Sequence, residues 1–437
     1  MSAVRNVSYF LIMAALIVMV GQFQSWNLAL SIVNLCLISS IMALGVNMQW
    51  GYAGLFNVGI MGFAALGGLA AMLISVAPVA EAWSAGGVGV ILGFLVLVLT
   101  VLAAAFSYQK MHGKPFRRFI VALIVIIGYM IMRSQFDPAT NAIERVNPAS
   151  TGFLGGFGLP ILLAWPVGGL LAGAAAWVVG KITLGLRADY LAIATLGISE
   201  IIVAILKNED WMTRGVKNVV GLPRPVPYEI NLQNSDWFVQ LATHLDTDPV
   251  TFSSIFVKLC YAALFTVVLL LILYLCEKAL RSPWGRMMRA IRDNEVSANA
   301  MGKDVKARHL QVFILGSVVV GIAGAMLTTL DGQLTPSSYQ PLRFTFLIWV
   351  MVIVGGSGNN WGAVLGGFVI WFFWIQSEPL GIWLMDVATS QMDATSALRA
   401  HLIDSAQHMR LITMGLILLL TLRFSPRGLL PERAGKH

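Results

Sequence analysis

Charged residues are scarce in this sequence. Asp, Glu, Lys and Arg make up 11% of its 437 residues and hydrophobic residues make up 57%, whereas an ordinary soluble domain carries about 25% charged residues. This composition excludes a soluble globular domain and predicts a polytopic membrane protein. The apolar runs are far longer than the roughly ten-residue alternating strands of a membrane barrel, and lipid does not accept open strand edges. We therefore predict an all-α helical bundle.

The residues and motifs of enzyme sites are also scarce. The three cysteines, Cys36, Cys260 and Cys276, lie in or beside apolar runs without metal-ligand spacing, so we expect free, buried thiols. The six histidines are dispersed, and neither HExxH nor GxSxG is present. We predict that the chain is not an enzyme and that it holds no cofactor and no metal.

A nucleotide-binding loop is missing as well. The glycine-rich segment 355–367, GGSGNNWGAVLGG, lacks the lysine of a phosphate-binding loop, and G-x-x-x-x-G-K-[ST] occurs nowhere in the sequence. We interpret the segment as a tight cytoplasmic turn between two packed spans. The net charge of +8 comes from basic residues scattered among the loops between apolar runs, a pattern that fits a lipid bilayer better than nucleic acid as the partner.

Long apolar runs dominate what is present. A helix that crosses about 30 Å of hydrocarbon needs roughly 20 residues. The candidate runs are residues 9–24, 28–47, 55–76, 86–107, 118–133, 160–180, 188–206, 254–278, 310–330, 344–357, 361–376 and 409–423. The pair around Gly355 to Gly362 is short enough to be re-entrant or one broken helix, so we predict ten to twelve spans in a single membrane domain that covers residues 1–437.

Loop charges orient this arrangement, because Lys and Arg collect on the cytoplasmic side. With twelve crossings the basic clusters fall on one side: Arg5, residues 110–118, Lys181, Arg187, residues 281–309 and the tail from Arg423. The other side receives residues 207–250, with six acidic and four basic residues, and residues 377–410, with four acidic and two basic. We predict that both termini are cytoplasmic and that 207–250 and 377–410 are the larger periplasmic loops.

The segment from Gly51 to Gly68, GYAGLFNVGIMGFAALGG, has six glycines in eighteen residues. Each interior glycine costs a helix up to about 1 kcal/mol relative to alanine, so the backbone itself is needed there. One interpretation is close helix packing through small residues. The other is a broken helix that lines a translocation path, with Gly51, Gly54, Asn57 and Gly59 as its candidate residues.

A second candidate part of the path is the apolar helix 188–206, which carries Thr195 and Glu200. A carboxylate within a membrane span is expensive and is a functional candidate by default. The alternative is that Glu200, about a turn and a half from the helix end, reaches the membrane interface.

Residues 281–309 form the one strongly charged stretch between two apolar runs, with seven Lys or Arg and three Asp or Glu. The run Asp293-Asn294-Glu295, followed by Ala298 and Ala300, predicts a short helix that ends at Gly302. Such a helix suits contact with a groove on a soluble partner. The alternative is a solvated basic loop that rests on anionic lipid head groups.

Several of these motifs together resemble the LivM family of permeases from branched-chain amino acid ABC importers. They are GYAGLFNVG, LRADYLAIATLGISEI, SPWGRMMRAIRDNEVSANAMGKDV, GIAGAM, VIVGGSGNNWGAVLGG and FSPRGLLPE, in the order of the family. The resemblance implies a subunit in the bacterial inner membrane that pairs with a second permease, two cytoplasmic ATP-binding cassettes and a periplasmic binding protein. It also implies that Arg292, Glu295, Ala298 and Gly302 couple the permease to the ATPase.

The resemblance has departures, and it leaves other functions open. TRGVKNVVGLP stands where the family is expected to carry a run like TGGPNGL, and the acidic segment 377–410 is longer than usual. Urea or short amides are therefore alternative substrates to branched-chain amino acids. A secondary transporter driven by an ion gradient is a different class, for which Glu200 is the only good coupling carboxylate. A polytopic membrane enzyme is a third.

Overall fold

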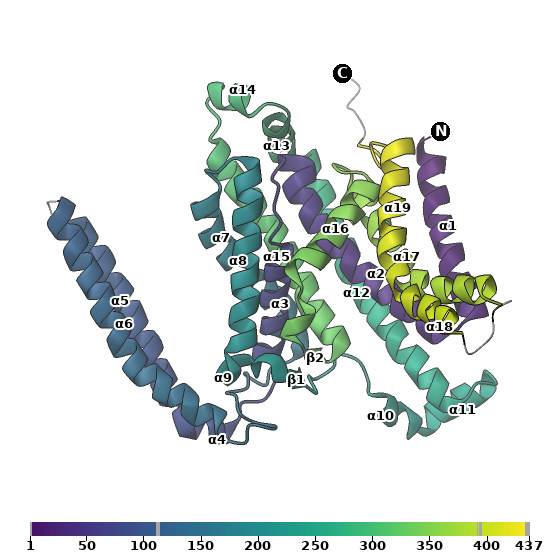
Figure 1. The fold of residues 1–437 in the computed structure, drawn as a ribbon, viewed down its shortest axis with the longest axis horizontal. Helices are drawn as coiled ribbons and strands as arrows, with labels where there is room; N and C mark the ends of the chain where they lie inside the picture. The colour runs from purple at the N-terminus through teal and green to yellow at the C-terminus, as the bar shows by residue number, and fades with distance from the viewer. Residues whose placement is uncertain (1, 111–113, 391, 393–395, 433–437) are drawn as a thin grey trace.

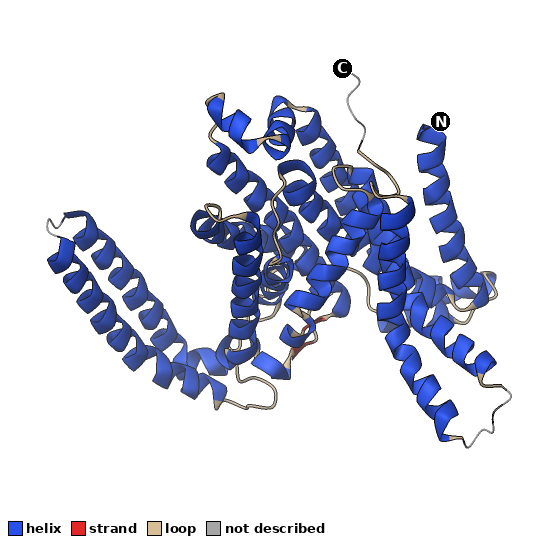
Figure 2. Cartoon of the chain, turned by 45° about the horizontal axis from the view of Figure 1, so that its top comes forward, coloured by secondary structure: helices blue, strands red, loops and turns tan. Residues whose placement is uncertain are grey.

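The protein is a bundle of membrane helices (Figures 1 and 2). The computed structural model describes residues 2–110, 114–390, 392 and 396–432. Parts of three predicted segments lie outside these residues: 111–113 of the basic cluster, 391 and 393–395 of the 377–410 segment, and 433–437 of the tail. The strands of the described chain are β1 (Val219–Val220) and β2 (Gln333–Leu334), which pair antiparallel with Val219 opposite Leu334. The all-α prediction is confirmed.

Most of the predicted apolar runs form long helices. Within the described residues, eight helical segments are long and apolar enough to cross a membrane. They are α2 with η1 (Trp26–Val46 and Asn47–Tyr52), α4 with η2 and α5 (Ala80–Ala82, Trp83–Gly87 and Val88–Lys110), α6 (Lys114–Glu144), η3 with α7 (Ile161–Leu163 and Ala164–Thr183), α8 (Ala188–Asn208), α12 (Pro249–Arg281), α15 (Val305–Asp331) and α17 (Asn360–Ala388).

The other runs form shorter or bent helices. α18 (Ala397–Asp404) and α19 (Met409–Phe424) make one apolar pair bent by 56°, with η6 (Ser405–His408) between them. Shorter apolar helices lie in α1 (Ser2–Phe23), in α3 (Ile60–Ser75) and in α16 (Pro341–Gly355). Each of the twelve predicted runs thus corresponds to a helix or helix pair, and the chain is a polytopic membrane protein.

Short elements fill the connections. The connections after α8 and after α15 hold α9 (Asp210–Thr213), η4 (Gly215–Lys217), α10 (Glu229–Gln233), α11 (Asp236–His244) and η5 (Pro336–Ser338), and the charged stretch holds α13 (Pro283–Asp293) and α14 (Glu295–Ala300). The segment 377–410 is more helical than a loop, because α17 continues through Pro379 to Ala388. Glu378 on this extension pairs with Arg410, which ties α17 to α19.

Helix α15 occupies the centre of the bundle, where it packs on α2, α3 and α7. Glycines allow these helices to approach closely. A Cβ atom at Gly168 of α7 would lie 3.1 Å from the Cα of Gly67 in α3, and one at Gly324 of α15 would collide with the backbone of Ala64. The second half of the 51–68 glycine cluster therefore serves small-residue packing.

Helices α5 and α6 form a hairpin that stands apart from the rest of the bundle (Figure 1). They pack on each other. In the most apolar 18-residue stretch of each, only 11% and 6% of the residues are buried inside the protein. Trp211 of α9 connects the hairpin base to the bundle through ring contacts with Phe136 and Phe94, at centroid distances of 5.4 and 6.2 Å. The exposed apolar faces of this hairpin suit direct contact with lipid.

The start of α1 and the end of α19 lie at the end of the bundle that carries α13 and α14, whereas β1, β2 and α9–α11 lie toward the opposite end (Figure 1). Residues 281–309 and 207–250, which the loop charges predict to lie on opposite sides of the membrane, thus lie toward opposite ends of the bundle. The three cysteines are free, with Cys36 and Cys276 buried and Cys260 half-buried.

Candidate functional site

The third apolar run is a broken span. Helix α2 passes into the π-helical turn η1, and residues 54–59 have no regular secondary structure before α3 begins at Ile60. Gly54 has φ +71°, a left-handed conformation that favours glycine, and its backbone lies against the side chain of Arg292. Part of the glycine cluster therefore allows a break in the helix, as one of the two interpretations predicted.

Asn57 satisfies the polar groups exposed by the break. Its Nδ2 donates to Gln49 Oε1 at 2.8 Å, and its Oδ1 accepts from the backbone N–H of Gly59 at 2.8 Å. The indole Nε1 of Trp349 donates to the Asn57 carbonyl at 3.0 Å. Because lipid supplies no hydrogen-bond partners, side chains must satisfy this backbone. Asn57 is 1% exposed and acts as a structural link at the break.

Gln49 and Trp349 are parts of this site that the sequence reasoning missed. Gln49 Nε2 donates to the Phe313 carbonyl at 2.9 Å and to Ser317 Oγ at 3.2 Å, which joins the break to α15. The rings of Trp50 and Phe56 lie 4.7 and 4.6 Å from that of Trp349. The available signal was a glutamine within a long apolar run, where a polar side chain needs a hydrogen-bond partner.

Thr195 of α8 meets the same break. Its Oγ1 accepts from the Val58 N–H at 3.1 Å and donates to the Leu191 carbonyl at 2.9 Å. A Cβ atom at Gly59 would lie 2.5 Å from the Thr195 carbonyl oxygen, so α8 and the break are in backbone contact. The structure thus brings Asn57, Gly59 and Thr195 together.

Glu200 does not join them. It is exposed on α8, whereas the neighbouring Ser199 is buried beside Gly62 of α3. The exposed positions around Glu200 include Ile193, 70% exposed, and Ile201, 59% exposed. A carboxylate on an otherwise apolar helix face is costly to expose to lipid, so this face suits an aqueous path or a partner helix.

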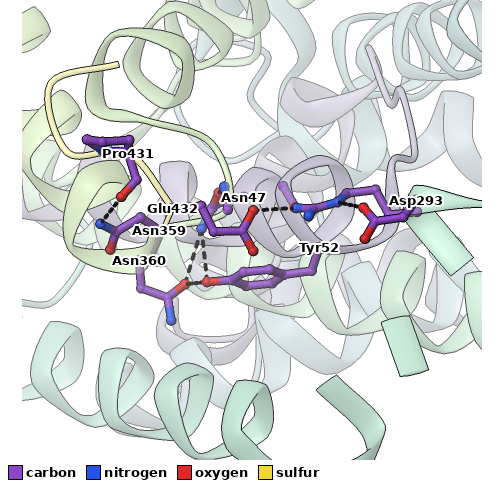
Figure 3. Close-up of polar contacts among 10 residues, drawn as sticks. Asn47, Tyr52, Asp293, Asn359, Asn360, Pro431 and Glu432 are labelled. Atoms are coloured by element: carbon purple, nitrogen blue, oxygen red, sulfur yellow. Dashed lines mark hydrogen bonds and ion pairs between the residues drawn. The ribbon is translucent and has the colours of Figure 1, made fainter. Parts of the chain in front are cut away.

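Gly51 and Arg292 lie at the end of the break that adjoins α13. The Arg292 guanidinium of α13 donates from Nη1 to the Gly51 carbonyl and forms ion pairs with Glu432 at 3.0 Å and Asp293 at 3.2 Å (Figure 3). Burial lowers the pKa of Arg292, but the Glu432 carboxylate outweighs burial and raises its pKa overall. Arg292 therefore ties α13 to η1 and is directed into the protein.

An amide and phenol network continues from this point (Figure 3). Asn47 Nδ2 and the Tyr52 hydroxyl both donate to Asn360 Oδ1, the first at 3.2 Å, and Asn360 Nδ2 donates to Glu277 Oε1 at 3.1 Å. The Gly358 N–H donates to Asn47 Oδ1 at 2.8 Å. Residues 356–359 of the glycine-rich segment form the predicted turn between α16 and α17, while residues 360–367 begin α17. The segment also contacts η1 through Gly358 and Asn360.

The segment 425–432, which we term the C-terminal strap, closes the network. The N–H groups of Leu429 and Leu430 donate to the carbonyls of Val354 and Gly355 at 2.8 and 2.9 Å. Leu430 is 1% exposed. These bonds place Glu432 beside Arg292, so the strap connects the end of α16 to α13.

The predicted short helix is present as α14. The Asn294 side chain caps it by accepting from the Ser297 N–H at 2.9 Å, and Gly302 follows it with φ +75°. No residue of α14 is buried. Val296 and Met301 are 80% and 78% exposed, which presents an apolar surface beyond the bundle. Glu295, Ala298 and Gly302 belong to this projecting unit, whereas Arg292 belongs to its base.

Comparison with known proteins assigns the chain to a family. Residues 28–422 match the family described as branched-chain amino acid transport system / permease component. A probable branched-chain amino acid transport permease protein LivM of Methanocaldococcus jannaschii is 27% identical over 36% of this chain and 42% of its own length. The high-affinity branched-chain amino acid transport system permease protein LivM of Escherichia coli is 24% identical over 49% of this chain and 50% of its own length.

More distant transporters match as well. The xylose transport system permease protein XylH of Escherichia coli is 32% identical over 30% of this chain and 33% of its own length. The matches therefore span half or less of each of these relatives. No solved structure matches the chain. The match over residues 28–422 covers most of the chain, so this protein belongs to the branched-chain amino acid transport system permease component family.

Proposed function

We propose that this chain is a permease subunit of an ATP-binding-cassette importer that moves amino acids, branched-chain ones in particular, across a bacterial inner membrane. Its partners would be a second permease, two cytoplasmic ATP-binding cassettes and a periplasmic binding protein. The observation that carries the proposal is α14, a helix with no buried residue whose neighbour α13 is bonded through Arg292 to the broken span. A cassette that seated α14 would act on that span directly.

Orientation follows from the charges. The end of the bundle that holds α13 and α14 also holds the start of α1 and the end of α19 (Figure 1), and the basic clusters of the sequence collect at the ends of spans on that side. Under the positive-inside rule this end is cytoplasmic. β1, β2 and α9–α11 would then face the periplasm, where a substrate-binding protein docks.

The path in this proposal runs beside the break. Gly51, Gly54, Asn57 and Gly59 supply the break, and Thr195 anchors it to α8. The exposed face of α8 with Glu200 would border the path or the second permease. Movement of α13 would reach the break through Arg292 as a rigid-body shift.

The driving force distinguishes this proposal from a secondary transporter. The chain reconstituted with the second permease and the cassettes should accumulate substrate only when ATP is supplied. A proton or sodium gradient without cassettes should produce no accumulation, and Glu200→Gln should retain ATP-driven uptake because Glu200 is exposed rather than part of a buried ion site. Uptake against a gradient by the chain without an ATPase, abolished by Glu200→Gln, would instead establish ion coupling.

Substitutions on α14 test its docking. Val296→Asp combined with Met301→Asp should lower substrate-stimulated ATPase about thirtyfold, because two exposed apolar anchors at an interface contribute about 2 kcal/mol. Glu295→Lys and Gly302→Asp should act in the same direction, and Gly302→Asp also strains a backbone with φ +75°.

The control is Val220→Asp, which changes another exposed valine, 63% exposed against 80% for Val296, on the opposite side of the bundle. All variants should insert normally, as judged by the yield of monodisperse protein. If the α14 variants and Val220→Asp retained the same ATPase coupling, α14 would not be the docking helix.

A further inference from the structure

A groove of about 630 Å³ lies beside the last turns of α12. One part of its lining is apolar and consists of Leu270, Leu273 and Tyr274, and the other part is basic and consists of Lys278 and Arg281. Trp361, at the start of α17 and 46% exposed, forms the facing wall. The groove therefore changes from apolar to cationic along one helix.

The dimensions of this gradient match one class of ligand. Leu270 and Arg281 are separated by about 16 Å along the helix, at about 1.5 Å per residue. α12 has 33 residues, or about 50 Å, so its final turn extends beyond about 30 Å of hydrocarbon. In a bilayer with α13 and α14 on its aqueous side, the apolar part of the groove would lie at the depth of acyl chains and the basic part at the depth of phosphates.

The two cations of the groove are only weakly paired within the protein and could bind an anion. Lys278 Nζ lies 6.0 Å from the centre of the Tyr274 ring, and the Arg281 side chain is 83% exposed and reaches Glu277 at 3.6 Å. Glu277 also lines the groove, but its carboxylate already accepts from Asn360. A polar cavity of about 330 Å³ shares Glu277, Arg281 and Trp361 and adds Arg289.

We propose that this groove binds an anionic phospholipid of the inner leaflet. One acyl chain would lie along Leu270, Leu273 and Tyr274, and the phosphate would lie between Lys278 and Arg281, as in basic pockets at cytoplasmic helix ends. Trp361 would lie at the glycerol level, where tryptophan is enriched. The occupant is a lipid, because a soluble anion would leave the apolar part of the groove without a contact. An apolar helix would leave the basic part without an anion.

The site adjoins the polar network described above. Glu277 lines the groove and also accepts a hydrogen bond from the Asn360 amide. The same Asn360 side chain accepts from Tyr52 and Asn47 (Figure 3). A bound lipid head group would draw Arg281 away from Glu277 and leave that carboxylate with Asn360. Lipid binding would thereby strengthen the contact between α12 and α17 at the end of the break that adjoins α13.

The proposal is tested on the full-length chain, purified with its partners and separately without them, by native mass spectrometry. Phosphatidylglycerol should be retained about tenfold more than phosphatidylcholine, which corresponds to about 1.4 kcal/mol. Lys278→Ala with Arg281→Ala should remove this preference. Leu270→Trp, at a residue that is 54% exposed, should also reduce retention by filling the groove while all charges remain.

The control variant is Lys181→Ala with Arg187→Ala at the junction of α7 and α8. It removes two basic residues on the same side, including a lysine 4.1 Å from the Trp177 ring, and should preserve the preference. Equal retention of the two lipids, or equal loss in both double variants, would overturn the proposal. Displacement by inorganic phosphate would identify a soluble anion instead, and loss of lipid only in the complete assembly would assign the groove to a protein partner.

Discussion

Replacing Arg292 by alanine is expected to leave the membrane bundle inserted but to uncouple ATP hydrolysis from transport. The substitution removes the bond to the Gly51 carbonyl and the pair with Glu432 at 3.0 Å. Hydrogen bonds to charged groups contribute about 1.5–3 kcal/mol, so α13 would lose its hold on η1. Substrate-stimulated uptake per ATP hydrolysed should fall about tenfold, measured in proteoliposomes that contain the complete transporter.

Arg286→Ala is the matched control, because Arg286 lies on the same helix but is exposed. It should couple normally. A double-mutant cycle of Arg292→Ala with Glu432→Gln should give an interaction energy of about 1–2 kcal/mol in thermal unfolding in detergent, since the two residues are in contact. Equal coupling in the Arg292 and Arg286 variants would contradict a role for Arg292 in transmission.

A single methyl group at Gly59 is expected to be strongly destabilising. The added Cβ atom would lie 2.5 Å from the Thr195 carbonyl oxygen, and backbone on both sides prevents an easy adjustment. Overpacking of this kind typically costs about 1–3 kcal/mol. Gly59→Ala should therefore lower the unfolding midpoint in detergent and reduce transport, because α8 must separate from the break.

Gly197→Ala provides the comparison within α8. Nothing lies within 4 Å of a Cβ atom at Gly197, and alanine is favoured in a helix by up to about 1 kcal/mol. This variant should be neutral or more stable. If the two glycine variants were equally stable, the close contact between the break and α8 would not be required for the fold.

These two experiments concern the same mechanical connection from different ends. Arg292 joins the projecting unit to η1, and Gly59 and Thr195 join the break to α8. The Asn57 and Gln49 amides lie between them and connect the break to α15. Movement of α13 would thus be shared among α2, α8 and α15.

The sequence determined the membrane fold because hydropathy and charge are sums over neighbouring residues. Twelve apolar runs gave the helices, and the basic clusters grouped the segments that the structure places at one end. α14 was also predictable, because the Asn294 cap and the left-handed Gly302 are local signals. The missing lysine excluded a phosphate-binding loop in segment 355–367, and its glycines predicted the turn that residues 356–359 form.

The tertiary structure decided which residues meet. Arg292 lies in the middle of the charged stretch, between the buried Ile291 and the exposed Asp293, and its guanidinium reaches a carbonyl 241 residues away. Glu200 and Thr195 differ by little over one helical turn, yet one is exposed and the other is buried at the break. Segment 51–68 contains both a break, at Gly54, and close packing, at Gly67, while its role in lining a path stays a prediction.

The physical reason is that a polar group inside a lipid bilayer is costly unless it forms a hydrogen bond or ion pair. Helix packing, rather than distance along the sequence, determines which partner lies within reach. Composition and periodicity reveal that a polar residue in an apolar run needs a partner. They do not reveal that Asn57 finds Gln49 or that Glu432 of the C-terminal strap finds Arg292. Those contacts depend on how the helices pack together.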